Sequence, residues 1–244
     1  MKAEVAQQRS LLEVAKLDAE LSRIAHQATH LPQQEAHGRI RVEHNAAGDR
    51  LAAVRIALED LDAQVSRFES EIDAVRKRED RDRSLLSSGA TDAKQLSDLQ
   101  HELETLQRRQ ASLEDSLIEV MERREELQAQ QAVESKVIEE LQGELVTAQQ
   151  ALDAALTQID QTRHQHSSRR DVLTATMDPV LSALYERQRA GGGPGAAPLL
   201  GHRCGACRIE IGRGELARIT AAAEDEVVRC PECNAILLRV KGLD

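Results

Sequence analysis

The sequence has almost no aromatic residues: its 244 residues include no Trp, one Tyr and one Phe. Aromatic side chains dominate the energetics of many globular cores, so a core of packed aromatic rings is excluded here. Charged residues make up 30% of the chain and are interleaved with Leu, Ala and Gln. This composition is typical of long helices and coiled coils. We therefore expect a mainly α-helical protein.

Long apolar runs are also missing. No stretch of about eighteen apolar residues occurs, and the N-terminal segment from Met1 to Val5 lacks the apolar centre of a signal peptide. We expect a soluble, cytoplasmic protein that does not bind a membrane. In that reducing compartment, paired cysteines are more often metal ligands than structural disulfides.

Basic charge is scarce outside the C-terminal region. The net charge is -10, and residues 196–244 hold seven basic and seven acidic residues, which leaves 25 basic and 35 acidic residues in 1–195. The long N-terminal region therefore carries the whole negative excess. It repels phosphate backbones, which argues against nucleic acid wrapping along it.

Apolar residues recur at alternating spacings of four and three, which is the heptad pattern of a coiled coil. The first such seam comprises Ala47, Leu51, Val54, Leu58, Leu61, Val65, Phe68, Ile72 and Val75. The second comprises Leu96, Leu99, Leu103, Leu106, Leu113, Leu117, Val120, Leu127, Leu141, Leu145, Ala148 and Leu152, with Gln110, Arg124 and Gln131 as polar interruptions. Two seams in sequence predict a long antiparallel coiled-coil hairpin.

Small residues and Gly89 between the seams predict the hairpin tip near residues 84–93. Thr91 or Asp92 can cap the second helix, and Asp92 and Gln95 have the spacing of a capping box. Folding the chain about residue 88 pairs residues whose numbers add to roughly 176.

Helix-breaking residues from Pro32 to Gly38 predict a kink near residues 32–38, and Gly143 weakens the other helix at the same level. A Gly/Pro segment follows the helices. We expect a helical hairpin over 1–190, a flexible linker over 191–200 and a small β-rich zinc ribbon over 201–244.

All four cysteines lie in this C-terminal region, as two CxxC pairs: Cys204, Cys207, Cys230 and Cys233. Two such turns supply the tetrahedral thiolate set that Zn²⁺ prefers, and four thiolates leave no position for a catalytic water. We therefore predict one structural zinc ion, no enzymatic activity and no small-molecule substrate. Redox-active thiols are the alternative.

Short β-rich pieces flank the two cysteine pairs, at residues 208–211, 226–229 and 236–240. The residue after the second cysteine of such a pair often needs a positive φ. Asn234 tolerates this conformation well and Arg208 less readily.

Arginines concentrate near the end of the hairpin and in the ribbon. They are candidate contacts for nucleic acid or for an acidic protein surface. The alternative is a solvated face whose arginines pair with local carboxylates. The candidates are Arg163, Arg169, Arg170, Arg187, Arg189, Arg203, Arg208 and Arg213.

Three features together resemble a bacterial family of coiled-coil hairpins that end in a C4 zinc ribbon, the FlgZ-like proteins. They are the tip region from Gly89 to Leu103, the junction from Tyr185 to Gly192 and the four cysteines. Asn234 and Gln95 depart from the family pattern, which has Gly and an acidic residue there.

The resemblance implies a non-enzymatic adaptor with the four cysteines as zinc ligands. It also implies a protein partner, the alternative sigma factor RpoN, and an ability to bind messenger RNA. Our first hypothesis is a scaffold that presents the ribbon to a protein partner. The alternatives are an RNA- or DNA-binding regulator and a redox-sensing switch.

Overall fold

The computed structural model describes residues 1–88 and 92–239. The chain forms two compact units. The base unit comprises Met1–Gln34 and Gln150–Asp244, and the hairpin unit comprises Glu35–Gln149. Within the described ranges, none of the helices combines the length and the apolar character that a membrane crossing requires.

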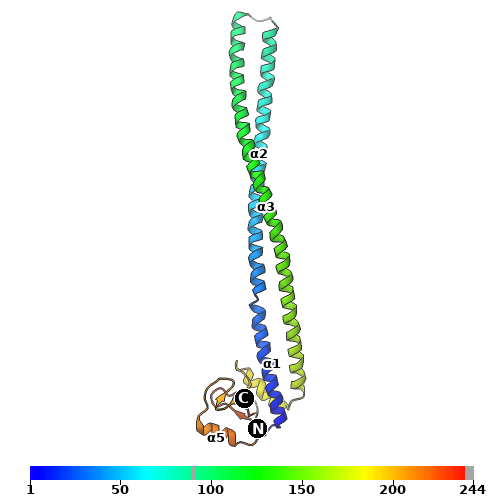
Figure 1. The fold of residues 1–244 in the computed structure, drawn as a ribbon, viewed down its shortest axis with the longest axis vertical. Helices are drawn as coiled ribbons and strands as arrows, with labels where there is room; N and C mark the ends of the chain where they lie inside the picture. Colours follow the sequence, from blue (N-terminus) through cyan, green and yellow to red (C-terminus); the bar gives the residue numbers. More distant parts are fainter. Residues whose placement is uncertain (89–91, 240–244) are drawn as a thin grey trace. The chain divides into compact units, whose positions relative to one another are not determined.

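Two long helices build the hairpin unit: most of α2 (Pro32–Ser87) and the first part of α3 (Ala93–Ala175). They run antiparallel (Figure 1), and ion pairs such as Arg50 with Glu134 connect them. The first predicted seam is confirmed by burial. Six of its members are buried, namely Ala47, Leu51, Val54, Leu58, Ile72 and Val75. The second seam, on α3, is half-buried, apart from the exposed Leu96.

The pairing register differs slightly from the expectation. Ion pairs between α2 and α3 of the hairpin unit join residues whose numbers add to between 180 and 190, rather than to 176. The reason is that α2 continues through Ser87 and α3 begins at Ala93, so the midpoint between the two helices is residue 90 rather than residue 88. The antiparallel pairing itself is as expected.

The start of α3 is held by the predicted capping box. The Gln95 backbone N–H donates to Asp92 Oδ1 over 2.8 Å, and the Asp92 N–H donates to Gln95 Oε1 over 3.4 Å. Residues 84–87 of the expected tip are helical, whereas Gly89 and Thr91 lie outside the described residues.

Helix α1 (Val5–Thr29) belongs to the base unit and ends just before α2 begins at Pro32. The break therefore falls at residues 30 and 31, while residues 32–38, where we expected the kink, are helical. Proline fits the first position of a helix because the N–H that it lacks would have no partner there. Gly143 does not interrupt α3.

Helix α4 (Pro179–Arg189) follows α3 after a short turn. Asp178 caps it, because its carboxylate oxygen Oδ1 accepts hydrogen bonds from the N–H groups of Val180 (2.8 Å) and Leu181 (2.9 Å). This cap satisfies two of the N–H groups that a helix N-terminus leaves free.

The ribbon is a four-stranded sheet in the order β2-β1-β4-β3. Its strands are β1 (Ala196–Leu200), β2 (Arg203–Cys204), β3 (Val228–Arg229) and β4 (Ile236–Leu238). Strand β1 pairs parallel with β4 and antiparallel with β2, and β3 pairs antiparallel with β4.

Two parts of the ribbon differ from the sequence-based expectation. Residues 196–200, which the sequence places in the linker, form β1, an inner strand of the sheet. Residues 208–211 form a single bridge through Glu210 rather than a strand, and the unexpected helix α5 (Arg213–Ala221) follows them. Hydrophobic periodicity does not predict these elements, because β1 contains a proline and the apolar runs are short.

One core joins the helices of the base unit to the sheet. Buried residues of α1, α4 and the ribbon pack together there, and Leu11, Leu181 and Ile236 have no exposed surface. The full set of buried members is Ala3, Leu11, Leu12, Val14, Met177, Leu181, Tyr185, Ala196, Ile236 and Leu238. The ribbon is therefore packed onto the helices rather than suspended from a linker.

Residues 1–3 also contact the ribbon. The Ala3 N–H donates to Asp225 O over 2.7 Å, and Met1 O accepts from the Val227 N–H over 3.0 Å. The Lys2 ammonium lies 2.9 Å from the Asp225 carboxylate, and this contact lowers the pKa of Asp225. These bonds hold the segment before α1 against the loop that precedes β3.

Candidate zinc site

The two CxxC segments adopt the same backbone turn. In the first, the Arg208 N–H donates to Cys204 O (2.8 Å) and the Cys204 N–H donates to Ile209 O (3.1 Å). In the second, the Asn234 N–H donates to Cys230 O (3.0 Å), and the Cys230 N–H donates to Ala235 O in the same way.

The predicted positive φ is confirmed at both positions that follow the second cysteine. Arg208 and Asn234 each have a φ of 60°. This conformation turns the chain sharply, so that the two cysteines of each pair face the same point.

Packing fixes the first turn against the sheet. The Gly205 N–H donates to Pro198 O over 2.9 Å, and a Cβ atom at Gly205 would lie only 2.7 Å from that oxygen. Cys204 and Cys230 are each 1% exposed and pack in a small core with Ile211, Ile219 and Leu237. Cys207 is half-buried, and Cys233 is exposed.

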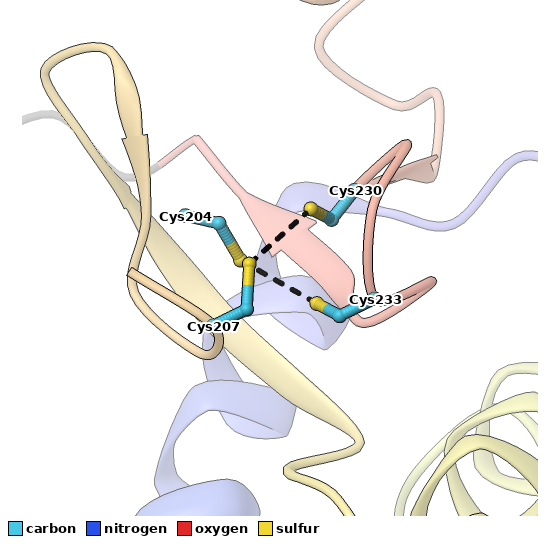
Figure 2. A group of neighbouring side chains, drawn as sticks. All are labelled: Cys204, Cys207, Cys230 and Cys233. Carbon is cyan, nitrogen blue, oxygen red and sulfur yellow. Dashed lines mark hydrogen bonds between the residues drawn. The ribbon is translucent and has the colours of Figure 1, made fainter. Parts of the chain in front are cut away.

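Two of the distances between the four sulfur atoms equal the edge of a zinc tetrahedron, and the others are compatible with a shared metal ion. The Sγ atoms of Cys204 and Cys233 are 3.8 Å apart, and those of Cys207 and Cys230 are also 3.8 Å apart (Figure 2). All four lie within 4.8 Å of one another. A tetrahedron with a Zn–S distance of 2.3 Å has edges of about 3.8 Å. The donor set therefore fits one zinc ion.

The environments of the thiols differ. Burial raises the pKa of the Cys204 thiol to about 12, and burial also raises the pKa of Cys233. The pKa of Cys207 is lowered, chiefly because its sulfur accepts a hydrogen bond from the Ile209 backbone. Since zinc binds the thiolate forms, metal binding at this site releases protons.

Comparison with known proteins agrees with this geometry. Residues 14–193 match the model of the CT398-like coiled coil hairpin domain, and residues 203–237 match that of the C4-type zinc ribbon domain. The chain belongs to the CT398-like family. The resemblance drawn from the tip, the junction and the cysteines is thus confirmed at the level of the two domains.

Two mycobacterial relatives match all or nearly all of this CT398-like chain. Rv2229c of Mycobacterium tuberculosis is 77% identical over 244 residues, which is 100% of both chains. ML1638 of Mycobacterium leprae is 62% identical over 229 residues, covering 94% of this chain and 99% of the relative.

Solved structures show the same fold. A protein from Mycobacterium smegmatis, 62% identical, has a TM-score of 0.89 and is matched over 98% of this chain and 100% of its own. CT398 of Chlamydia trachomatis is 17% identical with a TM-score of 0.70, over 96% of this chain and 98% of its own. At that identity the likeness concerns the fold alone.

Most of the candidate arginines at the helical end of this CT398-like chain contact carboxylates. Arg163 pairs with Asp160 (2.5 Å) and Arg169 with Glu13 (3.2 Å). Arg170 and Arg189 both contact Asp18 and Glu186. These four arginines therefore pair with nearby carboxylates, as expected if they form a solvated surface rather than a binding site.

The remaining candidates are exposed and form no ion pair with a described carboxylate: Arg187, Arg203, Arg208 and Arg213. Arg187 lines a cavity of about 520 Å³ together with Cys207, Cys233 and Asn234. Arg187, on α4, is thus the one of these four that lines a cavity together with the two less buried cysteines.

Sequence reasoning missed a buried polar cluster around Asp18, which is 5% exposed. Its Oδ1 accepts from Arg170 Nε over 2.7 Å, and its Oδ2 accepts from the Tyr185 hydroxyl over 2.7 Å. Burial by itself lowers the pKa of Arg170, but the hydrogen bonds to Asp18 and Glu186 outweigh it and raise that pKa. The cluster connects α1, α3 and α4, and Tyr185 also belongs to the core that these helices share with the ribbon.

Proposed function

We propose that this CT398-like protein is a non-enzymatic adaptor of the cytoplasm, which presents a structural zinc ribbon on a helical base to a protein partner. The partner that we propose is a component of the transcription machinery, as the resemblance to FlgZ-like proteins implies. The observation that carries the proposal is the closed sulfur site. Four thiolates at tetrahedral spacing fill the coordination shell of zinc, which leaves no position for a substrate or a catalytic water.

Packing of the ribbon on the helices supports the same function. Because β1 and β4 share a core with α1 and α4, the ribbon has a fixed orientation on the base unit. A fixed surface binds a partner at a lower entropic cost than a module on a flexible linker. In this proposal zinc maintains the shape of the surface and takes no part in chemistry.

The test is affinity purification of the tagged protein from its own cells, with and without nuclease treatment. We expect a protein partner that remains after nuclease treatment and is lost with the Cys204→Ser variant. Ala206→Ser is the matched control, because it places a serine in the same turn while keeping all four cysteines. A partner that is retained equally by Cys204→Ser would contradict the proposal.

The second candidate function is binding of RNA or DNA, and one observation favours it. Arg187, Arg203, Arg208 and Arg213 are exposed on α4 and the ribbon, with no described carboxylate paired to them. Such binding is driven by phosphate contacts, falls steeply with salt and has little sequence preference.

The second candidate predicts that replacing Arg203 and Arg208 by Ala weakens binding to a labelled single-stranded RNA and reduces its salt dependence. Replacing Arg163 and Arg169, which have carboxylate partners, leaves that binding unchanged. Binding that is insensitive to both salt and these residues would exclude this function.

A further inference from the structure

A groove between α1 and the ribbon combines features that suit a peptide. It has a volume of about 430 Å³ and is lined by the first turns of α1, by β1 and the residue after it, and by the segment that ends α5. Its apolar wall comprises Val5, Leu199 and Ala222. All of these residues belong to the base unit, in which α1 packs directly against β1.

One polar side chain in the groove has an unused acceptor. Gln8 is only 6% exposed, and its Nε2 group donates to Ala3 O over 2.9 Å and to Glu224 O over 3.1 Å. Its Oε1 atom has no hydrogen-bond partner among the described residues. This oxygen is therefore free to accept a hydrogen bond from an N–H group of a bound peptide.

The charges that line the groove favour a negative ligand. Arg9 is exposed and forms no ion pair with a described carboxylate. Arg239 also lines the groove, and its guanidinium donates to the carbonyl oxygens of Ile219 (3.0 Å) and Ala222 (2.6 Å). Its Nε is buried without a partner in the part of the chain that the structure describes. Glu224, which also lines the groove, already has an interaction of its own.

We infer that this groove binds a short acidic segment of a protein partner, with aliphatic side chains beside its carboxylates. Arg9 pairs with a carboxylate of the segment, Gln8 Oε1 accepts a backbone N–H, and Val5 and Leu199 contact an aliphatic side chain. The segment does not extend the sheet, because β1 already has a neighbouring strand on each side. This inference rests on the proposed adaptor function and gives it a binding site.

The probe is a phage-displayed library of short random linear peptides, selected against the zinc-loaded full-length protein. We expect the selected peptides to be enriched in Asp and Glu next to Leu, Ile and Val. Their affinities are then measured by fluorescence anisotropy with synthetic copies, and with copies in which Asn and Gln replace Asp and Glu.

Charge reversal at Arg9 gives the decisive comparison. Arg9→Glu should weaken peptide binding about tenfold or more, since an attractive charge contact becomes repulsive. Lys16→Glu is the matched control, because Lys16 is an exposed cation two turns further along α1 and does not line the groove. It should leave the affinity nearly unchanged. Zinc content and circular dichroism establish that both variants are folded.

Three outcomes would overturn the inference. They are selection of peptides without acidic enrichment, binding that survives Arg9→Glu, and full competition by free succinate at the concentration of the peptide. The last would assign the groove to a small carboxylate instead of a protein segment. A cellular partner that is kept by Arg9→Glu but lost with Cys204→Ser would support the adaptor function and exclude only the groove as its binding site. If no cellular partner is found, the adaptor function is wrong, whereas the peptide measurements still show whether the groove binds an acidic segment.

Discussion

Tyr185 is the only tyrosine of the chain, and its hydroxyl donates a 2.7 Å hydrogen bond to the buried carboxylate of Asp18. Burial and this hydrogen bond raise the pKa of Tyr185 above its ordinary value of 10. With no Trp present, ultraviolet absorbance follows this one phenol directly. We therefore expect the folded protein to form no tyrosinate around pH 10, while the unfolded protein does.

The raised pKa of Tyr185 also makes one contribution to the pH dependence of stability. Above pH 10 the unfolded chain loses the phenol proton and the folded chain keeps it, so the free energy of unfolding falls as the pH rises. The contribution is fully present below pH 10. Tyr185→Phe leaves an Asp18 oxygen without its donor and should cost about 1–3 kcal/mol in urea unfolding. Tyrosinate absorbance near pH 10 in the folded protein would refute this account.

Arg208 offers a second residue-level prediction. Its φ of 60° is unfavourable for a residue with a side chain, by about 1–2 kcal/mol, and glycine lacks this penalty. Arg208→Gly should therefore raise the thermal stability of the zinc-loaded ribbon. Arg213→Gly is the control, since Arg213 lies at the start of α5 and has no positive φ. Equal effects of both changes would show that the conformation at residue 208 carries no strain.

Contacts between residues close in sequence are predictable here, and contacts between distant residues are not. The four cysteines and the positive φ at Arg208 and Asn234 depend on spacings of a few residues, so the pattern indicates them directly. The partners of Asp18 lie 152 and 167 positions away, and no local pattern connects them. A lone Asp near Leu17 in α1 looks like any residue of a charged helix.

On α2, the buried seam continues beyond Val75, the last apolar residue of the predicted pattern. Glu79 and Asp82 follow Val75 at the same spacings of four and three, and they are 3% and 9% exposed. One buried oxygen of each, Glu79 Oε1 and Asp82 Oδ2, has no hydrogen-bond partner within residues 1–88 and 92–239. Polar residues at seam positions lower the stability of a coiled coil.

Asp82→Leu should therefore stabilise the hairpin unit by about 1–3 kcal/mol, because it removes a buried polar group that lacks a partner. Asp80→Leu is the matched control, since the Asp80 side chain is 76% exposed and leucine gains nothing there. The measurement is urea unfolding followed by circular dichroism. A loss of stability with Asp82→Leu would mean that this carboxylate has a favourable contact within the hairpin.

Element prediction succeeded where a repeat is long and failed where elements are short. The heptad seams of α2 and α3 persist over many turns, and the Asp92–Gln95 capping box marks the start of α3. Strand β1 and helix α5 span five and nine residues. Their arrangement is set by packing around the cysteines and against α1, which periodicity cannot reveal.

For the whole molecule, the two units should respond differently to removal of zinc. All four cysteines belong to the base unit, and a module as small as the ribbon obtains much of its folding free energy from a structural metal. Chelation should unfold the ribbon and uncover Leu11 and Leu181, which pack with Ile236 and Leu238. The hairpin unit is stabilised by its own coiled-coil packing and should stay helical.

Hydrogen exchange measured by mass spectrometry, with and without a chelator, tests this expectation. Exchange should rise in residues 1–29 and 177–239 and stay unchanged in residues 47–87. Returning zinc should restore protection in the ribbon, which serves as the internal control. A uniform rise in exchange over the entire chain would show that the two units unfold together.

The bonds between residues 1–3 and the loop before β3 have a consequence for biosynthesis. Lys2 and Asp225 are 223 positions apart, so the ribosome must translate nearly the whole described chain before they can meet. The hairpin unit has no such requirement and can form while the ribbon is still being synthesised. An interrupted translation product would thus expose the apolar side of α1, including Leu11 and Leu12, to chaperones and proteases. The base unit can therefore complete its folding only after residue 227 has been synthesised.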